Sequence, residues 1–269
     1  MTATQELQTT VLEQAVLRVQ PVRGEGSGRP GTRVAYAHRL SNDGNITVTV
    51  DLDYFTQDPA NSPLWNDNTT ISTDTVTIAP GDFRDIGVNV TVPETGQVGT
   101  QATTYISATV ASYPDQTRYF SDTTTVALEV EAEMFPDETQ PGEAGGEVIF
   151  YHTVRNLSNG PATYRLNTQA NYDSTVTFES DTPGVTINPA SNTFTLDNVF
   201  APPLRTNTMR LKVTVRLDPL LLPGDQEVLN IFLTDAATNS SIGGAAVVDR
   251  VNITRGQIQP RLWFPMLFN

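Results

Sequence analysis

Cysteine is absent from the 269 residues of this chain. Its absence excludes a disulfide framework, a thiolate metal site and a cysteine nucleophile. No apolar run approaches the roughly 20 residues of a membrane-spanning helix. The N-terminal segment lacks both the charged start and the apolar core of a signal peptide. We therefore expect no transmembrane segment, and a fold whose stability comes from its core and its assembly.

Positive charge is also scarce. The chain carries 16 basic and 30 acidic residues, a net charge of −14, and Lys212 is its only lysine. Nucleic acids require a basic face, so they are excluded as partners. A strongly acidic balance suits an exposed surface that resists nonspecific association.

What the chain does contain is strand alternation, and it is clearest in residues 75–100. Apolar side chains alternate with polar or small ones, first at Val76 and Ile78 and then from Ile86 to Val92. Alternation with a period of two places one face on a core and the other in water. Pro93 ends the second run because it cannot donate to a strand ladder. This pattern is typical of an antiparallel β-sandwich.

Further strands are predicted in residues 16–22, 34–40, 46–52, 103–111 and 121–130. The sequence Asp43-Gly44 is a hairpin signal between two of them. Residues 24–31, with four glycines, are interpreted as a flexible turn, and residues 53–68 as an irregular loop bearing aromatic side chains.

The pattern then repeats. Residues 34–42 align with 148–156 at an offset of 114, and residues 88–92 align with 211–215 at an offset of 123. The change in offset predicts a loop insertion within 182–194 or 198–207. We therefore expect an all-β chain with two tandem sandwiches, 1–131 and 132–258, followed by a hydrophobic tail, 259–269.

The run TVTIAPGD, VNVTVPETGQVGT and YISATVAS resembles the Ig-like repeat modules of bacterial cell-surface proteins. Those modules include the adhesion-related bacterial domain and the conserved surface-repeat domain. The resemblance covers about residues 15–130 and, more loosely, 132–257. It implies two tandem Ig-like antiparallel β-sandwich domains in an extracellular protein at the cell surface, of a kind that mostly spaces, stiffens or assembles.

The catalytic signals are weak. The only two histidines, His38 and His152, fall at equivalent positions of the repeat, which favours a structural role as satisfied, partly buried strand residues. No nucleophile elbow, zinc-protease motif or phosphate loop is present. We expect a protein that is not an enzyme and has no cofactor.

Three features could bind a ligand or carry a modification. Carboxylates cluster near the expected boundary, where Ca²⁺ could bind although the spacing of a calcium loop is missing; these are Glu129, Glu131, Glu133, Asp137, Glu138 and Glu143. A second, weaker acidic group is Asp51, Asp53 and Asp58. Six sequons offer glycosylation sites in a secreted chain, at Asn45, Asn68, Asn89, Asn156, Asn239 and Asn252. Lys212 allows at most one lysine–asparagine cross-link, and its strand position argues against one.

The C-terminal tail concentrates large apolar side chains: Leu262, Trp263, Phe264, Met266, Leu267 and Phe268. Burying them is worth on the order of 10 kcal/mol as an upper bound. Three fates remain open, which are packing on its own domain, docking in a neighbouring subunit, and serving as a sorting or anchoring signal.

These observations predict a structural subunit of a bacterial surface filament, pilus-like fibre or sheath. The expected partner is another copy of the chain, reached through the N-terminal segment, about 1–22, or through the tail. The alternative is an adhesion or carbohydrate-binding module, for which the aromatic loop residues Tyr54, Phe55 and Trp65 are the candidate ligand contacts.

Overall fold

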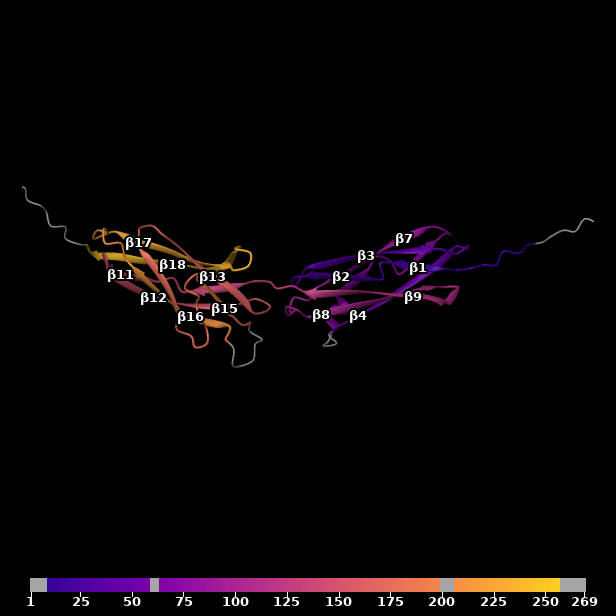
Figure 1. The fold of residues 1–269 in the computed structure, drawn as a ribbon, viewed down its shortest axis with the longest axis horizontal. Coiled ribbons are helices and arrows are strands. Elements are labelled where there is room, and N and C mark those ends of the chain that lie inside the picture. Colours follow the sequence, from indigo (N-terminus) through magenta and orange to yellow (C-terminus); the bar gives the residue numbers. More distant parts are fainter. Residues whose placement is uncertain (1–8, 59–62, 199–205, 257–269) are drawn as a thin grey trace, which may run out of the picture. The chain divides into compact units, whose positions relative to one another are not determined.

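The computed structural model describes residues 9–58, 63–198 and 206–256. The chain divides into two compact units, Met1–Glu129 and Val130–Asn269, called unit 1 and unit 2 below. Each unit is built almost wholly of strands (Figure 1). The division falls just before the expected boundary between residues 131 and 132.

Unit 1 has nine strands and one short helix in its described residues. They are β1 (Leu17–Gln20), β2 (Arg23–Gly28), β3 (Arg33–Asn42), β4 (Val48–Gln57), α1 (Pro63–Asp67), β5 (Thr69–Ile71), β6 (Thr75–Ile78), β7 (Phe83–Thr91), β8 (Gln101–Val110) and β9 (Tyr113–Val126). A four-stranded sheet has the order β1-β3-β7-β5, and a five-stranded sheet has the order β2-β9-β8-β4-β6.

The core of unit 1 lies between these two sheets. Leu40 of β3 and Val88 of β7 reach it from one sheet, and Val50 of β4 and Ile106 of β8 from the other. The alternation seen in the sequence has this cause, because successive side chains of a strand point to opposite faces.

Unit 2 repeats this arrangement strand for strand in its described residues. Its strands are β10 (Ala132–Phe135), β11 (Thr139–Glu143), β12 (Glu147–Asn156), β13 (Ala162–Ala170), β14 (Thr175–Ser180), β15 (Thr193–Leu196), β16 (Thr208–Arg216), β17 (Gln226–Asp235) and β18 (Ser241–Arg255). The sheet orders are β10-β12-β16-β14 and β11-β18-β17-β13-β15, the same as in unit 1. The chain is therefore two tandem Ig-like β-sandwiches, as the alternation predicts.

Strand register corrects one part of the sequence alignment. His38 pairs with Ile86 in unit 1, and His152 pairs with Leu211 in unit 2. Ile86 and Leu211 are therefore equivalent, and the offset at β7 and β16 is 125 (211 minus 86), whereas the alignment gave 123. A slip of two residues keeps every side chain on the same face, so the hydrophobic pattern alone cannot detect it.

Two segments predicted as loops are strands. The glycine-rich stretch forms β2, an edge strand that pairs in parallel with β9. A Cβ atom on Gly26 would lie 2.7 Å from Val34 Cγ1, so the glycine is needed for close packing. Residues 53–57 of the predicted loop continue β4, and residues 63–67 form the short helix α1.

The N-terminal residues 14–22 pack on the sandwich of unit 1, to which they belong. β1 pairs with β3, and before it Asn45 donates its backbone N–H to Gln14 O at 2.9 Å. The chain then passes from one sheet to the other at the cis peptide bond before Pro21, and unit 2 does the same before Pro136. The hypothesis that residues 1–22 cross into a neighbouring subunit is therefore wrong for residues 14–22, because their hydrogen bonds are made within the unit.

Candidate ligand-binding surface

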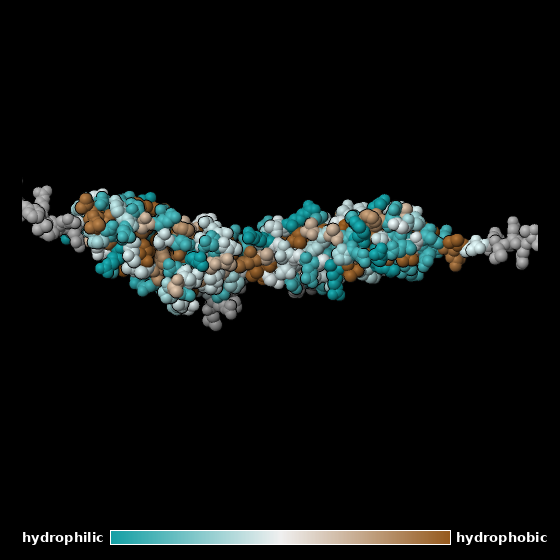
Figure 2. Space-filling model, turned by 45° about the horizontal axis from the view of Figure 1, so that its top comes forward, coloured by the Kyte–Doolittle hydropathy of each residue, from teal (hydrophilic) through white to brown (hydrophobic). Residues whose placement is uncertain are grey.

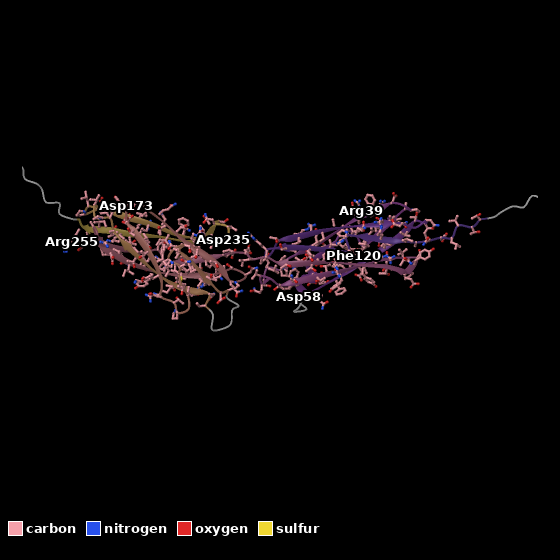
Figure 3. The ribbon with its side chains drawn as sticks, viewed as in Figure 1. Arg39, Asp58, Phe120, Asp173, Asp235 and Arg255 are labelled. Carbon is pink, nitrogen blue, oxygen red and sulfur yellow. The ribbon has the colours of Figure 1, made fainter. Side chains whose placement is uncertain are left out.

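A charged pair lies buried at the centre of unit 1. His38 of β3 has no exposed side-chain surface, and neither does Asp122 of β9. The His38 Nε2 lies 2.9 Å from Asp122 Oδ2, and the Nδ1 lies 2.8 Å from the carbonyl oxygen of Pro21. Both ring nitrogens face hydrogen-bond acceptors, so both must donate. The geometry is that of an imidazolium ion paired with a carboxylate, resting against Phe120 at 4.5 Å between ring centroids. Figure 3 labels Phe120 within the sandwich.

Unit 2 contains a copy of this pair. His152 Nε2 lies 2.9 Å from Asp249 Oδ2, and its Nδ1 lies 2.8 Å from the Pro136 carbonyl oxygen. Both side chains are fully buried. In each unit the ion pair links the two sheets, and the histidine also binds the proline carbonyl where the chain crosses between sheets, before β2 in unit 1 and before β11 in unit 2. The ion pair therefore has a structural role within its own sandwich. The expected structural role of the histidines fits this geometry, although they are wholly rather than partly buried.

The protonation of both histidines follows from their partners. Burial lowers the pKa of His38, but the hydrogen bonds to Asp122 and the Pro21 carbonyl, with the charge of Asp122, raise it above its ordinary value overall. Burial likewise lowers the pKa of His152, and the hydrogen bond and charge of Asp249 outweigh it and raise the pKa. The imidazolium form is thereby stabilised in both cores.

A buried asparagine closes the same hairpin in each unit. The Nδ2 of Asn42 donates to the carbonyl oxygens of Ile46 and Ile78 at 2.7 and 3.0 Å. Asn156 donates to those of Gly160 and Leu196 at 3.0 and 3.1 Å. A side-chain amide so placed ties the end of one strand to backbone carbonyl groups of the loop that follows it and of the opposite sheet.

This arrangement corrects one predicted glycosylation site. Asn156 is fully buried, so its amide cannot accept a glycan in the folded protein. Asn45, Asn239 and Asn252 are exposed, and Asn68 and Asn89 are half-buried.

The acidic groups at the expected boundary have protein partners. Glu133 pairs with Arg155 at 2.7 Å, and Glu143 pairs with Arg255 at 3.4 Å. Asp137 accepts the backbone N–H of Val248. The described residues contain no group of three or more histidine or acidic side chains placed to hold a metal ion. Lys212 pairs with Glu179 at 2.7 Å.

The three predicted ligand aromatics have different positions. Trp65 of α1 is only 3% exposed and belongs to the core, so it cannot contact a ligand. Tyr54 occupies an inward position of β4 and packs against the same core, and its hydroxyl donates a hydrogen bond to Thr69 O at 2.8 Å. Phe55 alone is exposed, because it is the outward residue between Tyr54 and Thr56 on β4. The residues of the predicted tail, 262–268, lie outside the described residues.

Phe55 belongs to a group of aromatic side chains that we call the aromatic surface, formed by Phe55, Tyr105 and Tyr119 on the outer face of the five-stranded sheet of unit 1. Their exposed fractions are 56%, 43% and 76%. Phe55 and Tyr105 are cross-strand partners whose rings stack at 5.0 Å between centroids, with 22° between their planes. Tyr119 lies one strand further, opposite Ser107. Sequence analysis missed the two tyrosines, because Tyr105 stands at an outward position of the predicted strand 103–111 without a visible partner and Tyr119 precedes the predicted strand 121–130, whereas β9 begins at Tyr113.

Two shallow hollows flank Tyr105 on this face. One, of about 230 Å³, is lined by all three aromatic residues together with Asp53 and Ser107. The other, of about 340 Å³, is lined by Gln57, Gln101 and Thr103 and shares Tyr105. Aromatic rings and hydrogen-bonding side chains thus alternate along one face.

Unit 2 has the same backbone here and different side chains. Gln169 pairs with Asn230 where Phe55 pairs with Tyr105. Ala246 pairs with Phe232 where Tyr119 pairs with Ser107. The aromatic surface is therefore a feature of unit 1 alone and is not required by the fold.

No helix in the described part of the chain is long and apolar enough to cross a membrane. No known protein family matches this sequence, and no curated protein matches it either.

Among solved structures the chain is similar to several proteins that match most of its length. Titin domains Z1Z2, in complex with telethonin, share 12% identity over 92% of this chain and 100% of theirs, with a TM-score of 0.33. The CupB2 chaperone of Pseudomonas aeruginosa shares 8% identity over 87% of this chain and 98% of its own, with a TM-score of 0.31.

A Porphyromonas gingivalis W83 protein of unknown function shares 11% identity over 88% of this chain and 99% of its own, with a TM-score of 0.33. Similarities of this size carry no conclusion about function. The sheets and registers of the chain itself establish its fold as a tandem of Ig-like β-sandwiches.

Proposed function

We propose that this chain is a non-enzymatic, extracellular structural protein, a subunit of a bacterial surface filament, pilus-like fibre or sheath. The observation that carries the proposal is the full repetition of one sandwich together with its buried ion pair. Each copy places its single histidine inside its core, where the histidine holds two sheets and a strand crossing together. We also propose that the protein works without a cofactor.

Exposed aliphatic side chains support contacts between copies. Val11 and Leu12 are 78% and 81% exposed in unit 1, and Figure 2 shows hydrophobic atoms where the described chain begins. Leu220 and Leu222 are exposed in unit 2. A contact between two different apolar patches of identical subunits is heterologous, and such contacts generate open fibres. The tail, 259–269, is proposed to add to this contact.

The test is the size of the particles that the purified chain forms. Light scattering and negative-stain microscopy should show fibres or a ladder of oligomers at micromolar concentration. Replacing both Val11 and Leu12 with serine, or deleting residues 260–269, should reduce assembly and leave a folded chain. Leu157→Ser is the matched control, since Leu157 is an exposed leucine of a loop in unit 2. A strictly monomeric wild-type chain would overturn the proposal.

The second candidate function is adhesion, in which the sandwiches present a binding surface. The aromatic surface favours it, because soluble proteins rarely keep such a group of exposed rings without a partner. Both functions can belong to one surface protein, and they make separate predictions.

A further inference from the structure

We propose that the aromatic surface of unit 1 binds a neutral, extended polysaccharide. This inference rests on the second candidate function, adhesion, and it names the residues and the ligand class. Of the three predicted ligand aromatics, Phe55 alone is an exposed ring of this surface. Tyr105 and Tyr119 join it from β8 and β9, two strands that Figure 1 labels in unit 1.

The two units provide an internal control for this inference. The backbone registers of their five-stranded sheets match at these positions, but unit 2 has Gln169, Asn230 and Ala246 where unit 1 has its three rings. Folding therefore does not need rings at these three positions, although unit 2 has one half-buried ring on this face, Phe232, where unit 1 has Ser107. Rings left in water on one copy alone indicate a role in binding.

The charge of this face selects a neutral ligand. None of the outward residues of β4, β8 and β9 is a lysine or an arginine, and two are aspartates. These residues are Thr49, Asp51, Asp53, Phe55 and Gln57 on β4, Gln101, Thr103, Tyr105, Ser107 and Thr109 on β8, and Thr117, Tyr119, Ser121, Thr123 and Thr125 on β9. Anionic glycans and nucleic acids would meet repulsion from Asp51 and Asp53, and the cation that this face does have, Arg23, lies on the edge strand β2 opposite Ser121.

The remaining chemistry matches that of a sugar chain. The face of an aromatic ring is electron-rich, so it attracts the weakly positive C–H groups of a pyranose ring. Sugar hydroxyls can donate to the carboxylate of Asp53 and exchange hydrogen bonds with Ser107 and Gln57. A β-linked pyranose chain presents C–H groups on its faces and hydroxyls at its edges, which corresponds to rings flanked by polar side chains.

The shape favours an extended chain over a single sugar. Tyr105 and Tyr119 are diagonal neighbours on adjacent strands, about 7–8 Å apart at Cα. The hollows on the two sides of Tyr105 are shallow and adjoin each other through it. A ligand several sugars long can lie across both, whereas a small ligand would be enclosed by neither.

The experiment measures binding of the full chain to defined oligosaccharides by isothermal titration calorimetry. Cellohexaose and chitohexaose are the neutral probes, and a heparin hexasaccharide is the anionic control. Wild type should bind a neutral probe and leave heparin unbound. Tyr119→Ala and Phe55→Ala should each weaken binding about tenfold, since each removes one ring contact. Phe83→Ala is the matched control, because Phe83 is an exposed ring on the other sheet of unit 1.

A gain-of-function variant tests the inference from the opposite side. Gln169→Phe, Asn230→Tyr and Ala246→Tyr together should give unit 2 a second site, raising the stoichiometry from one to two. Trp65 fluorescence, measured in a Trp263→Phe background, reports whether unit 1 remains folded in the loss variants.

The inference would be overturned if the wild-type chain bound neither neutral probe, or if Phe83→Ala weakened oligosaccharide binding as much as the Phe55 and Tyr119 variants do. It would also be overturned if removing the rings abolished self-association, because a second copy of the chain would then be the occupant of the aromatic surface. Light scattering of the same variants separates this inference from the filament proposal. The Phe55 and Tyr119 variants should still assemble, and the Val11 and Leu12 variant should still bind the glycan.

Discussion

The two units share their interior and differ on their surface. The buried ion pair, the hairpin asparagine and the proline at the strand crossing occur in both. The outward residues of the five-stranded sheets differ at the three positions of the aromatic surface. The conserved interior is what a sandwich of this topology needs in order to fold, and the divergent surface is where the two copies can acquire separate roles.

The largest expected effect comes from breaking the shared ion pair in one unit at a time. Asp122→Ala leaves the His38 ring facing no carboxylate, which should cost unit 1 about 3–5 kcal/mol of unfolding free energy. Asp249→Ala should do the same to unit 2. Denaturant unfolding followed by Trp65 fluorescence in a Trp263→Phe background reports unit 1, and calorimetry reports both units. Equal destabilisation of both units by Asp122→Ala would show that they do not unfold independently.

One buried tyrosine hydroxyl sharpens the comparison, because unit 1 has a valine at the equivalent position. Tyr164 occupies the position of Val50, and its hydroxyl lies 2.6 Å from Asn156 Oδ1 and 2.9 Å from Glu131 O. Burial first of all raises the pKa of Tyr164 to about 12. Tyr164→Phe should destabilise unit 2 by about 1–2 kcal/mol, since it leaves buried acceptors with fewer donors. An unchanged unfolding midpoint for unit 2 would contradict this account.

The pH dependence should be common to both units. Because the pKa of each histidine is raised by folding, its ion pair stabilises fully below about pH 6.5, the unfolded value, and the contribution is lost as the pH rises through the folded pKa. Thermal stability should therefore fall as the pH rises above about 6.5.

Nitrogen-15 NMR of the two imidazole rings provides the direct measurement. Each ring should show two protonated nitrogens at pH 6 and titrate above 6.5. A ring that is neutral at pH 6 would refute the assignment for its unit.

The smallest effect is expected at exposed ion pairs. Arg39 pairs with Asp85 at 2.8 Å and stacks on Phe83, and Figure 3 labels Arg39 on unit 1. Asp85→Ala should cost no more than about 1 kcal/mol, because water competes for both charges. Chemical denaturation in low and high salt checks this, and a cost comparable with that of Asp122→Ala would show that burial does not distinguish the two pairs.

Much of the fold could be predicted from the sequence, because strand alternation directly reflects which face is buried. Val48, Val50 and Leu52 are buried as the pattern predicts. The glycine-rich β2 was mistaken for a turn, because glycines packed beneath Tyr36 and Val34 resemble glycines chosen for flexibility. Helix α1 was missed because it is five residues long and shows no period.

The candidate site was harder to predict, because register decides which residues meet. Tyr105 and Phe55 are 50 residues apart, and only the pairing of β4 with β8 brings them together. The partners of the histidines were also hidden among 30 acidic residues. One signal was available in that case, since Asp122 and Asp249 occupy inward positions of apolar alternation, where an acid needs a buried partner.

The parallel pairing of β2 with β9 has a mechanical consequence. Residues 23–28 run beside 121–126 in the same direction, so the chain enters the pair at one end and leaves it at the other. A pull along the unit slides these strands lengthwise and loads all their hydrogen bonds together, whereas an antiparallel hairpin would open one bond at a time. Residues 139–143 and 250–255 repeat the arrangement in unit 2. Each unit thus contains a pair of parallel strands whose hydrogen bonds resist shear, which suits a protein held under tension.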